Sequence, residues 1–143
     1  GIYDKNQGIG FDDTDSEIFI PMCLSVADHF GLDSKGCIRC RLDMTFMSQG
    51  VQHNPHIDVP NPHWTGILYF SDTDGDTVIY NERWSLHGGR RSLLPNDDGL
   101  TVLERITPKK NRLVFFNGLH FHTGHSPTTT TNRILCNMNF SKK

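Results

Sequence analysis

His56 and Asp58, two residues apart, form the first pattern in this sequence that could bind a metal ion. Pro55 favours an extended backbone for the residue before it, and in an extended segment residues i and i+2 point to the same side. The two side chains could therefore bind one ion. Histidine and aspartate are both frequent in this chain, so the pattern can arise by chance and needs support from elsewhere in the sequence.

A second group of histidines, His120, His122 and His125, follows much later in the chain. A strand that carries them could supply a third ligand. Two histidines and one carboxylate on one face of a metal form the triad of non-haem Fe(II) oxygenases, which leaves the other coordination positions open. The residue types alone leave all three histidines as candidates for the third ligand.

Arg133 begins the last strand-like stretch of the chain. Apolar residues occupy one face of this stretch, and Arg133 shares the other face with Leu135, Asn137 and Asn139. A guanidinium at that position could hold a carboxylate through two parallel hydrogen bonds.

The elements that must position these residues follow from the hydrophobic period. Residues 1–15 are rich in Gly and Asp, which predicts an irregular segment. Apolar residues at helical spacing predict a helix over residues 16–31. Pro21 suits a first helical turn, which would start the helix near Ile20, and Gly31 suits its end.

After Lys35 the period changes to two, which predicts a β core over residues 37–140. In its first strand, apolar residues alternate with Arg39, Arg41, Asp43 and Thr45, so we expect the apolar face to be buried. Further strands are expected at 63–70, 77–80, 101–106, 112–116, 119–123 and 133–140. One helix and about eight short strands predict a mainly β jelly roll (double-stranded β-helix) with the helix packed on one sheet.

The four cysteines are too few for a disulfide scaffold in a chain of 143 residues. Cys37 and Cys40 have the spacing of a redox motif, but their flanks alternate like a strand, which would put the two sulfurs on opposite faces. We expect reduced, structural thiols, which favours a cytoplasmic location.

Length and charge restrict the remaining classes. The chain fits a single domain over residues 1–143. Its net charge of −2 argues against a nucleic-acid module held by bulk charge. No apolar run approaches the ~18 residues of a membrane span. The sequence lacks an initiator methionine and a secretory signal, so we expect a processed, trimmed or partial chain.

Two segments carry a family resemblance. They are PHIDVPNPHWTGILYFSDTDGDTVIYN (55–81) and NRLVFFNGLHFHTGHSPTTTTNRILCNMNF (111–140). The ordered pattern is H-x-D, an aromatic strand, Gly-Asp-Thr, Asn-Arg-hydrophobic-Phe-Phe, a distal His, a Pro and a final-strand Arg. It resembles the 2-oxoglutarate/Fe(II)-dependent dioxygenases, and within them the small prolyl-hydroxylase-like members of bacteria and viruses.

The resemblance implies a role for each matching residue. The iron ligands would be His56, Asp58 and His122, because the family spacing favours His122 over His120 and His125. Arg133 would pair with the distal carboxylate of 2-oxoglutarate. Tyr69 would hydrogen-bond the same carboxylate, Thr65 shares its strand face and would line the same pocket, and Thr77 is a weaker candidate.

One position departs from the family pattern. Prolyl-hydroxylase-like members often carry a tyrosine about ten residues before H-x-D, where this chain has Phe46. Arg39 or Arg41 could supply the missing hydrogen bond. These two arginines could instead hold an anionic substrate or form structural ion pairs near Asp43. Trp64 could gate the substrate or serve in packing.

The resemblance implies an enzyme that uses Fe(II), 2-oxoglutarate and O2, with ascorbate as an optional supporting reductant, and hydroxylates a substrate with release of succinate and CO2. The favoured substrate is a peptide, oxidised for example on a prolyl side chain, or a small molecule. Two alternatives are a cupin-like metal enzyme without an oxoacid and a non-catalytic jelly-roll binding module. Arg133 argues against the first, and the intact triad against the second.

Overall fold

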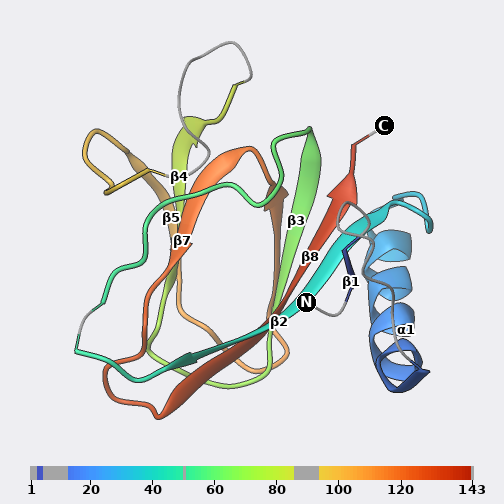
Figure 1. The fold of residues 1–143 in the computed structure, drawn as a ribbon, viewed down its shortest axis with the longest axis horizontal. Coiled ribbons are helices and arrows are strands. Elements are labelled where there is room, and N and C mark those ends of the chain that lie inside the picture. Colours follow the sequence, from blue (N-terminus) through green and yellow to red (C-terminus); the bar gives the residue numbers. More distant parts are fainter. Residues whose placement is uncertain (1–2, 5–12, 50, 86–93, 143) are drawn as a thin grey trace.

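Two antiparallel β-sheets face each other, and the helix lies outside the larger sheet (Figure 1). The computed structural model describes residues 3–4, 13–49, 51–85 and 94–142. The elements are β1 (Tyr3–Asp4), α1 (Asp13–His29), β2 (Cys37–Phe46), β3 (His63–Tyr69), β4 (Thr77–Arg83), β5 (Val102–Ile106), β6 (Leu113–Asn117), β7 (His120–Gly124) and β8 (Asn132–Ser141).

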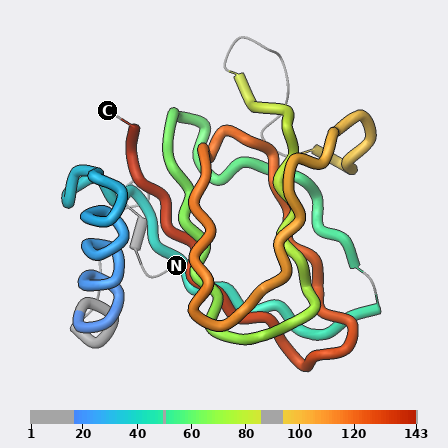
Figure 2. Tube along the Cα trace, turned by 180° about the vertical axis from the view of Figure 1, so that it is seen from behind, coloured from blue at the N-terminus to red at the C-terminus, as the bar shows by residue number. Residues whose placement is uncertain are grey.

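The larger sheet has the strand order β1-β2-β8-β3-β6, and the smaller has the order β5-β4-β7. Seen from behind, the chain wraps both sheets into a flattened barrel with α1 at its side (Figure 2). This architecture confirms the predicted jelly roll with one N-terminal helix, and each expected strand is present with small shifts at its ends. The assignment of residues 1–143 to a single domain stays a prediction. In the described part of the chain, no helix has the length and apolarity needed to cross a bilayer.

The helix begins earlier than predicted. α1 starts at Asp13, and Tyr3 and Asp4 pair with β2. The prediction of an irregular segment over residues 1–15 is therefore wrong for residues 3–4 and 13–15. Pro21 lies inside the helix and not in its first turn. It is exposed, as is Glu17 one turn earlier, so the carbonyl that loses its partner faces water. Gly31 does end the helix, with φ +63° and a hydrogen bond from Leu32 N to Ala27 O.

α1 covers only part of the larger sheet. Its buried residues Cys23, Val26 and Ala27 pack on the outer face of β2 and β8, against Cys40 and Phe140 among others. Beyond the helix, the outer face of β2 is open. The expectation that the whole apolar face of β2 is buried is therefore wrong, because Leu42, Met44 and Phe46 are exposed while the alternate polar residues turn toward the interior of the barrel.

None of the four cysteines forms a disulfide, and all four gather between α1 and the larger sheet. The sulfurs of Cys40 and Cys136 are 3.4 Å apart. Cys37 and Cys40 pack into the same cluster, which contradicts the prediction of opposite faces, because a bulge between Cys37 and Arg39 interrupts the alternation. Contact with Cys37 lowers the pKa of the Cys23 thiol, but contact with Cys40 and burial outweigh it and raise this pKa to about 12. These properties are those of unreactive thiols.

The Asp74 carboxylate holds the loop that leads into β8. It accepts hydrogen bonds from the backbone N–H groups of Thr128, Thr129 and Thr130 and from the hydroxyls of Thr128 and Thr130. The bond from the Thr128 hydroxyl is the largest cause that keeps the pKa of Asp74 well below its usual range. A carboxyl group with a depressed pKa stabilises the fold above its unfolded pKa, and this stabilisation is lost as the pH falls toward the folded value.

We therefore expect Asp74→Asn to lower the melting temperature at neutral pH and to weaken its fall below about pH 4. The measurement is thermal unfolding by circular dichroism across this pH range. Asp28→Asn, on the exposed side of α1, is the matched control and should leave the wild-type pH profile in place. An unchanged acid profile in Asp74→Asn would show that the carboxylate does not contribute to stability.

Candidate metal and cosubstrate site

The segment that carries His56 and Asp58 is fixed to β7 by its backbone. His56 N donates to His122 O at 2.9 Å, and His122 N donates to His56 O at 3.0 Å. The segment alternates as expected for an extended chain: Ile57 and Val59 are buried, and His56 and Asp58 point the other way. This pairing brings the H-x-D residues beside His122, although the two segments are far apart in sequence.

His56, Asp58 and His122 offer three ligand atoms that all lie within 4.8 Å of one another. His122 Nε2 is 3.5 Å from Asp58 Oδ2, and His56 Nε2 is 3.9 Å from Asp58 Oδ1. Both Nδ1 atoms face backbone carbonyls, of Asn54 and His120, so each imidazole presents Nε2 to the shared centre. Nε2 of His122 is buried without a hydrogen-bond partner. Two imidazoles and a carboxylate with such an orphaned nitrogen fit a metal such as Fe(II).

The electrostatics of the three groups also suit a cation. Burial by itself would raise the pKa of the Asp58 carboxyl, but its contacts with His122, His56 and Asn139 hold this pKa well below its usual range. Burial likewise lowers the pKa of His122, and the Asp58 carboxylate outweighs this and raises it. For His56, burial and the nearby His122 lower the pKa. Asp58 therefore provides a buried negative charge at the centre of the group.

Two asparagines on β8 orient the Asp58 carboxylate. Nδ2 of Asn137 lies 3.1 Å from Oδ2, and Nδ2 of Asn139 donates to the same oxygen at 3.0 Å. Arg39 Nη1 lies 3.7 Å from Oδ1. The sequence alone predicts no role for these two asparagines. The one sequence signal for their place in the site is that both share a strand face with Arg133. Groups that orient metal ligands in this way tune both ligand geometry and affinity.

A second polar group, formed by Arg133, Tyr69 and Thr77, lies in the same interior. Arg133 Nη2 donates to Thr77 Oγ1 at 2.6 Å, and the Tyr69 hydroxyl donates to the same oxygen at 2.6 Å. Arg133 is 6% exposed, and its Nε has no hydrogen-bond partner. Burial lowers the pKa of Arg133 and raises that of Tyr69. A buried guanidinium with an unpartnered N–H could bind an anion.

Two glycines make room for the Arg133 side chain. A Cβ at Gly124 would lie 2.8 Å from Nη1 and 3.2 Å from Nη2, and a Cβ at Gly75 would lie 2.9 Å from Cδ. A side chain at Gly124 would displace the guanidinium, and one at Gly75 would meet both the aliphatic stem of Arg133 and the His125 carbonyl oxygen, 2.6 Å away. The absence of a Cβ at Gly75 and Gly124 is therefore part of the arginine site.

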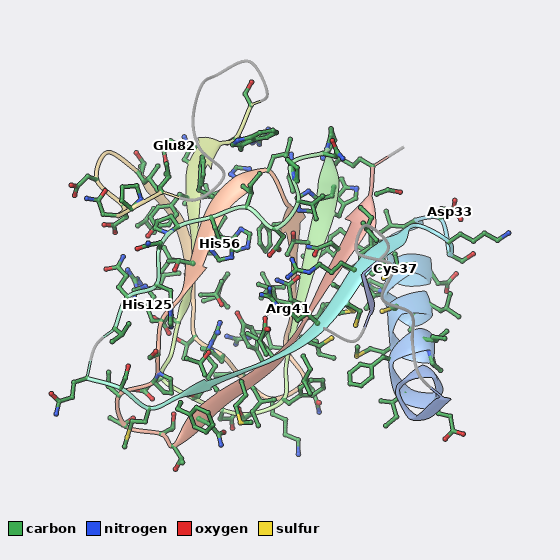
Figure 3. The ribbon with its side chains drawn as sticks, viewed as in Figure 1. Asp33, Cys37, Arg41, His56, Glu82 and His125 are labelled. Carbon is green, nitrogen blue, oxygen red and sulfur yellow. The ribbon has the colours of Figure 1, made fainter. Side chains whose placement is uncertain are left out.

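A cavity of about 280 Å³ joins the histidines to the arginine. Its walls include His56, His122, Thr77 and Arg133 together with the inward residues of β2. Figure 3 shows the Arg41 and His56 side chains reaching into the space between the sheets from opposite sides. Arg41 pairs with Asp43, with Nε and Oδ1 2.6 Å apart. Phe46, at the position of the family tyrosine, lies on the exposed outer face.

The remaining sequence candidates lie elsewhere. Thr65 does not line this cavity, because its hydroxyl oxygen accepts a hydrogen bond from Asn139 behind Asp58. His120 accepts from Arg83 and faces the Tyr80 carbonyl. Trp64 packs under the Lys142 ammonium, 3.8 Å from its ring centre. Within the described residues, one group has the ligand geometry of a metal site, and it contains His122 rather than His120 or His125.

Comparison with protein families assigns the chain to a superfamily. The model of the 2OG-Fe(II) oxygenase superfamily matches residues 42–141, and the chain belongs to that superfamily. The family therefore implies Fe(II) as the metal cofactor and 2-oxoglutarate and O2 as cosubstrates of an oxygenase. The finer resemblance to small prolyl-hydroxylase-like members stays a prediction.

Two further comparisons are less informative. Among solved structures, the chain is similar to NovW, a 4-keto-6-deoxy sugar epimerase from the novobiocin biosynthetic gene cluster of Streptomyces spheroides. The identity is 14% and the TM-score 0.46, over 82% of this chain and 52% of NovW, so the chain spans about half the length of that protein. No curated protein matches the chain.

Proposed function

We propose that this chain hydroxylates a C–H bond of its substrate, with His56, Asp58 and His122 as the iron ligands and Arg133 as the anchor of 2-oxoglutarate. One observation carries the proposal: a single cavity is lined by two facing histidines of a possible metal triad and by a buried arginine with a free N–H. When bound, Fe(II) would supply the activation of O2, coupled to the oxidative decarboxylation of 2-oxoglutarate to succinate and CO2.

The residues around Arg133 would orient the cosubstrate. Thr77 Oγ1 accepts hydrogen bonds from both Arg133 and Tyr69, so its two acceptor positions are occupied and its own hydrogen is left to donate. In the proposed complex, Arg133 and Thr77 would hold the distal carboxylate of 2-oxoglutarate. Tyr69 would act through Thr77, by fixing the direction of that hydroxyl. Because these donors are held in fixed positions, binding of the distal carboxylate would also orient the reacting end of 2-oxoglutarate.

The substrate class is the finer part of the proposal. The segments 55–81 and 111–140 resemble small prolyl-hydroxylase-like oxygenases, which favours a peptide-type substrate. On the β2 wall of the cavity, Arg41 pairs with Asp43, so this wall carries no net charge. We therefore expect contacts other than net charge to hold the substrate there.

An anaerobic titration tests the proposed function directly. We expect the protein to bind Fe(II) and then to develop a weak visible charge-transfer band when 2-oxoglutarate is added. Absorbance spectroscopy measures the band, and succinate does not produce it because it lacks the 2-oxo group. Iron binding without the band would favour a metal enzyme that uses no oxoacid, and absence of iron binding would overturn the site.

Gly124→Ala tests the arginine site without changing any polar group. The new methyl group would meet the guanidinium of Arg133, so we expect about tenfold weaker 2-oxoglutarate binding, with Fe(II) affinity retained. The same titration measures both. Gly66→Ala is the matched control, because a Cβ there meets its nearest neighbour, Phe115, at an ordinary 3.5 Å. Equal effects of the two substitutions would argue against a role for Gly124 in the site.

A further inference from the structure

The edge of β2 that faces away from β8 is open where the strand borders the cavity. β8 pairs with β2 along its whole length, from Cys37 opposite Phe140 to Phe46 opposite Asn132. On the other edge, within the described residues, β1 pairs only with Arg39 and Cys40. The main chain of residues 41–46 therefore has no strand partner on that edge among the residues that the structure describes. A row of unpaired backbone groups is a template for another strand.

This open edge is continuous with the proposed active site. Arg41, Asp43 and Thr45 point inward and line the cavity that His56 and His122 also line. Met44, from the opposite face of the strand, borders the same cavity, so the cavity extends to the edge of β2 itself. A chain lying along this edge would therefore run past the opening to the metal triad.

The outer face of the same segment is apolar and uncovered. Leu42, Met44 and Phe46 are 47%, 54% and 65% exposed. Natural edge strands are usually protected by charges, proline or a covering element. Residues 41–46 contain no proline, and α1 covers only the other end of the strand. Their two charged residues, Arg41 and Asp43, point inward and pair with each other. These properties fit an edge that is covered when a partner binds.

We propose that an extended peptide binds along residues 41–46 of β2 as an added strand and presents one inward side chain to the metal triad. The main chain of an open strand is complementary to another main chain, which selects a peptide over a small metabolite. Because side chains alternate along a strand, every second peptide residue would enter the cavity, and the others would pack on Leu42, Met44 and Phe46. The oxidation of the inward residue rests on the proposed function; the binding mode does not.

The test uses the Fe(II)- and 2-oxoglutarate-loaded protein, kept anaerobic, and a library of short acetylated and amidated peptides as the probe. Binding is measured by fluorescence anisotropy, and the best peptide is then N-methylated at each residue in turn. A strand-like complex requires alternate sensitivity, with binding lost when an amide that faces β2 is methylated and retained at its neighbours. Hydrogen exchange should show peptide-dependent protection over residues 41–46.

A pair of variants tests the outer face. We expect Leu42→Glu to weaken peptide binding about tenfold, through loss of an apolar contact and addition of a charge. Binding of Fe(II) and 2-oxoglutarate should be retained, because Leu42 lies on the outer face and outside the cavity. Leu103→Glu is the matched control, because Leu103 is 53% exposed on β5 and lies outside this cavity. Equal weakening by both variants would contradict the proposed surface.

Three other results would overturn the peptide proposal while the proposed function stands. In the first, no peptide binds a protein that gives the charge-transfer band. In the second, peptides bind without alternate sensitivity to N-methylation, or they protect residues away from β2 from hydrogen exchange. In the third, the chain self-associates and residues 41–46 are protected without peptide, which would identify a second copy as the occupant. If the peptides bind as a strand but the charge-transfer band does not form, only the proposed function is refuted.

Discussion

Replacing His122 with alanine is expected to lower Fe(II) affinity by more than about 100-fold and to abolish the 2-oxoglutarate charge-transfer band. Loss of a partner that only orients a metal ligand typically costs 10–100-fold in affinity, so about 100-fold is a lower bound for loss of the ligand itself. In this protein the His122 side chain is buried, and its Nε2 is 3.5 Å from Asp58 and has no hydrogen-bond partner. Metal binding is measured by anaerobic titration with Fe(II).

His120→Ala is the matched control for this experiment. His120 lies two residues away on the same strand and is also buried, but its ring nitrogens face Arg83 and the Tyr80 carbonyl. We expect this variant to keep its iron, with folding of both variants checked by circular dichroism. Loss of iron in His120→Ala but not in His122→Ala would transfer the ligand role to His120 and refute the proposed triad.

Arg133→Ala is expected to weaken 2-oxoglutarate binding about 100-fold while Fe(II) affinity changes little. A buried hydrogen bond to a charged group is worth about 1.5–3 kcal/mol, and two parallel bonds from one guanidinium reach the upper part of that range. Removing the guanidinium also leaves the cavity without its buried cation. The measurement is the 2-oxoglutarate concentration that gives half of the charge-transfer band.

Two controls separate charge from geometry at this site. Arg105→Ala removes the same charge from the exposed face of β5, where Nη1 lies 3.9 Å from Asp76 in an ion pair, and it should leave 2-oxoglutarate binding unchanged. Arg133→Lys keeps the charge but loses the planar pair of donors, so we expect partial loss. Wild-type binding in Arg133→Ala would show that the distal carboxylate is held elsewhere.

The sequence predicted most of the fold because the signals for it are local. Alternation of apolar and polar residues marked each strand, and Gly31 marked the end of α1. Errors arose where a local rule was overridden. Pro21 lies inside α1 because its missing hydrogen bond faces water, and the Cys37–Cys40 alternation fails because a bulge shifts the register. The outer face of β2 is apolar but open, since burial depends on what packs against a strand and not on its period.

By itself the sequence determined which side chains share a strand face. It placed His56 on one face with Asp58, and Arg133 on one face with Asn137 and Asn139. Only the tertiary structure decided which of these faces meet. The backbone pairing of His56 with His122 brings the triad together, and the β3–β8 register aligns Tyr69 with Leu135, close to Arg133. The physical reason is that side-chain direction follows from a two-residue repeat along one strand, whereas strand neighbours are set by contacts between segments far apart in the chain.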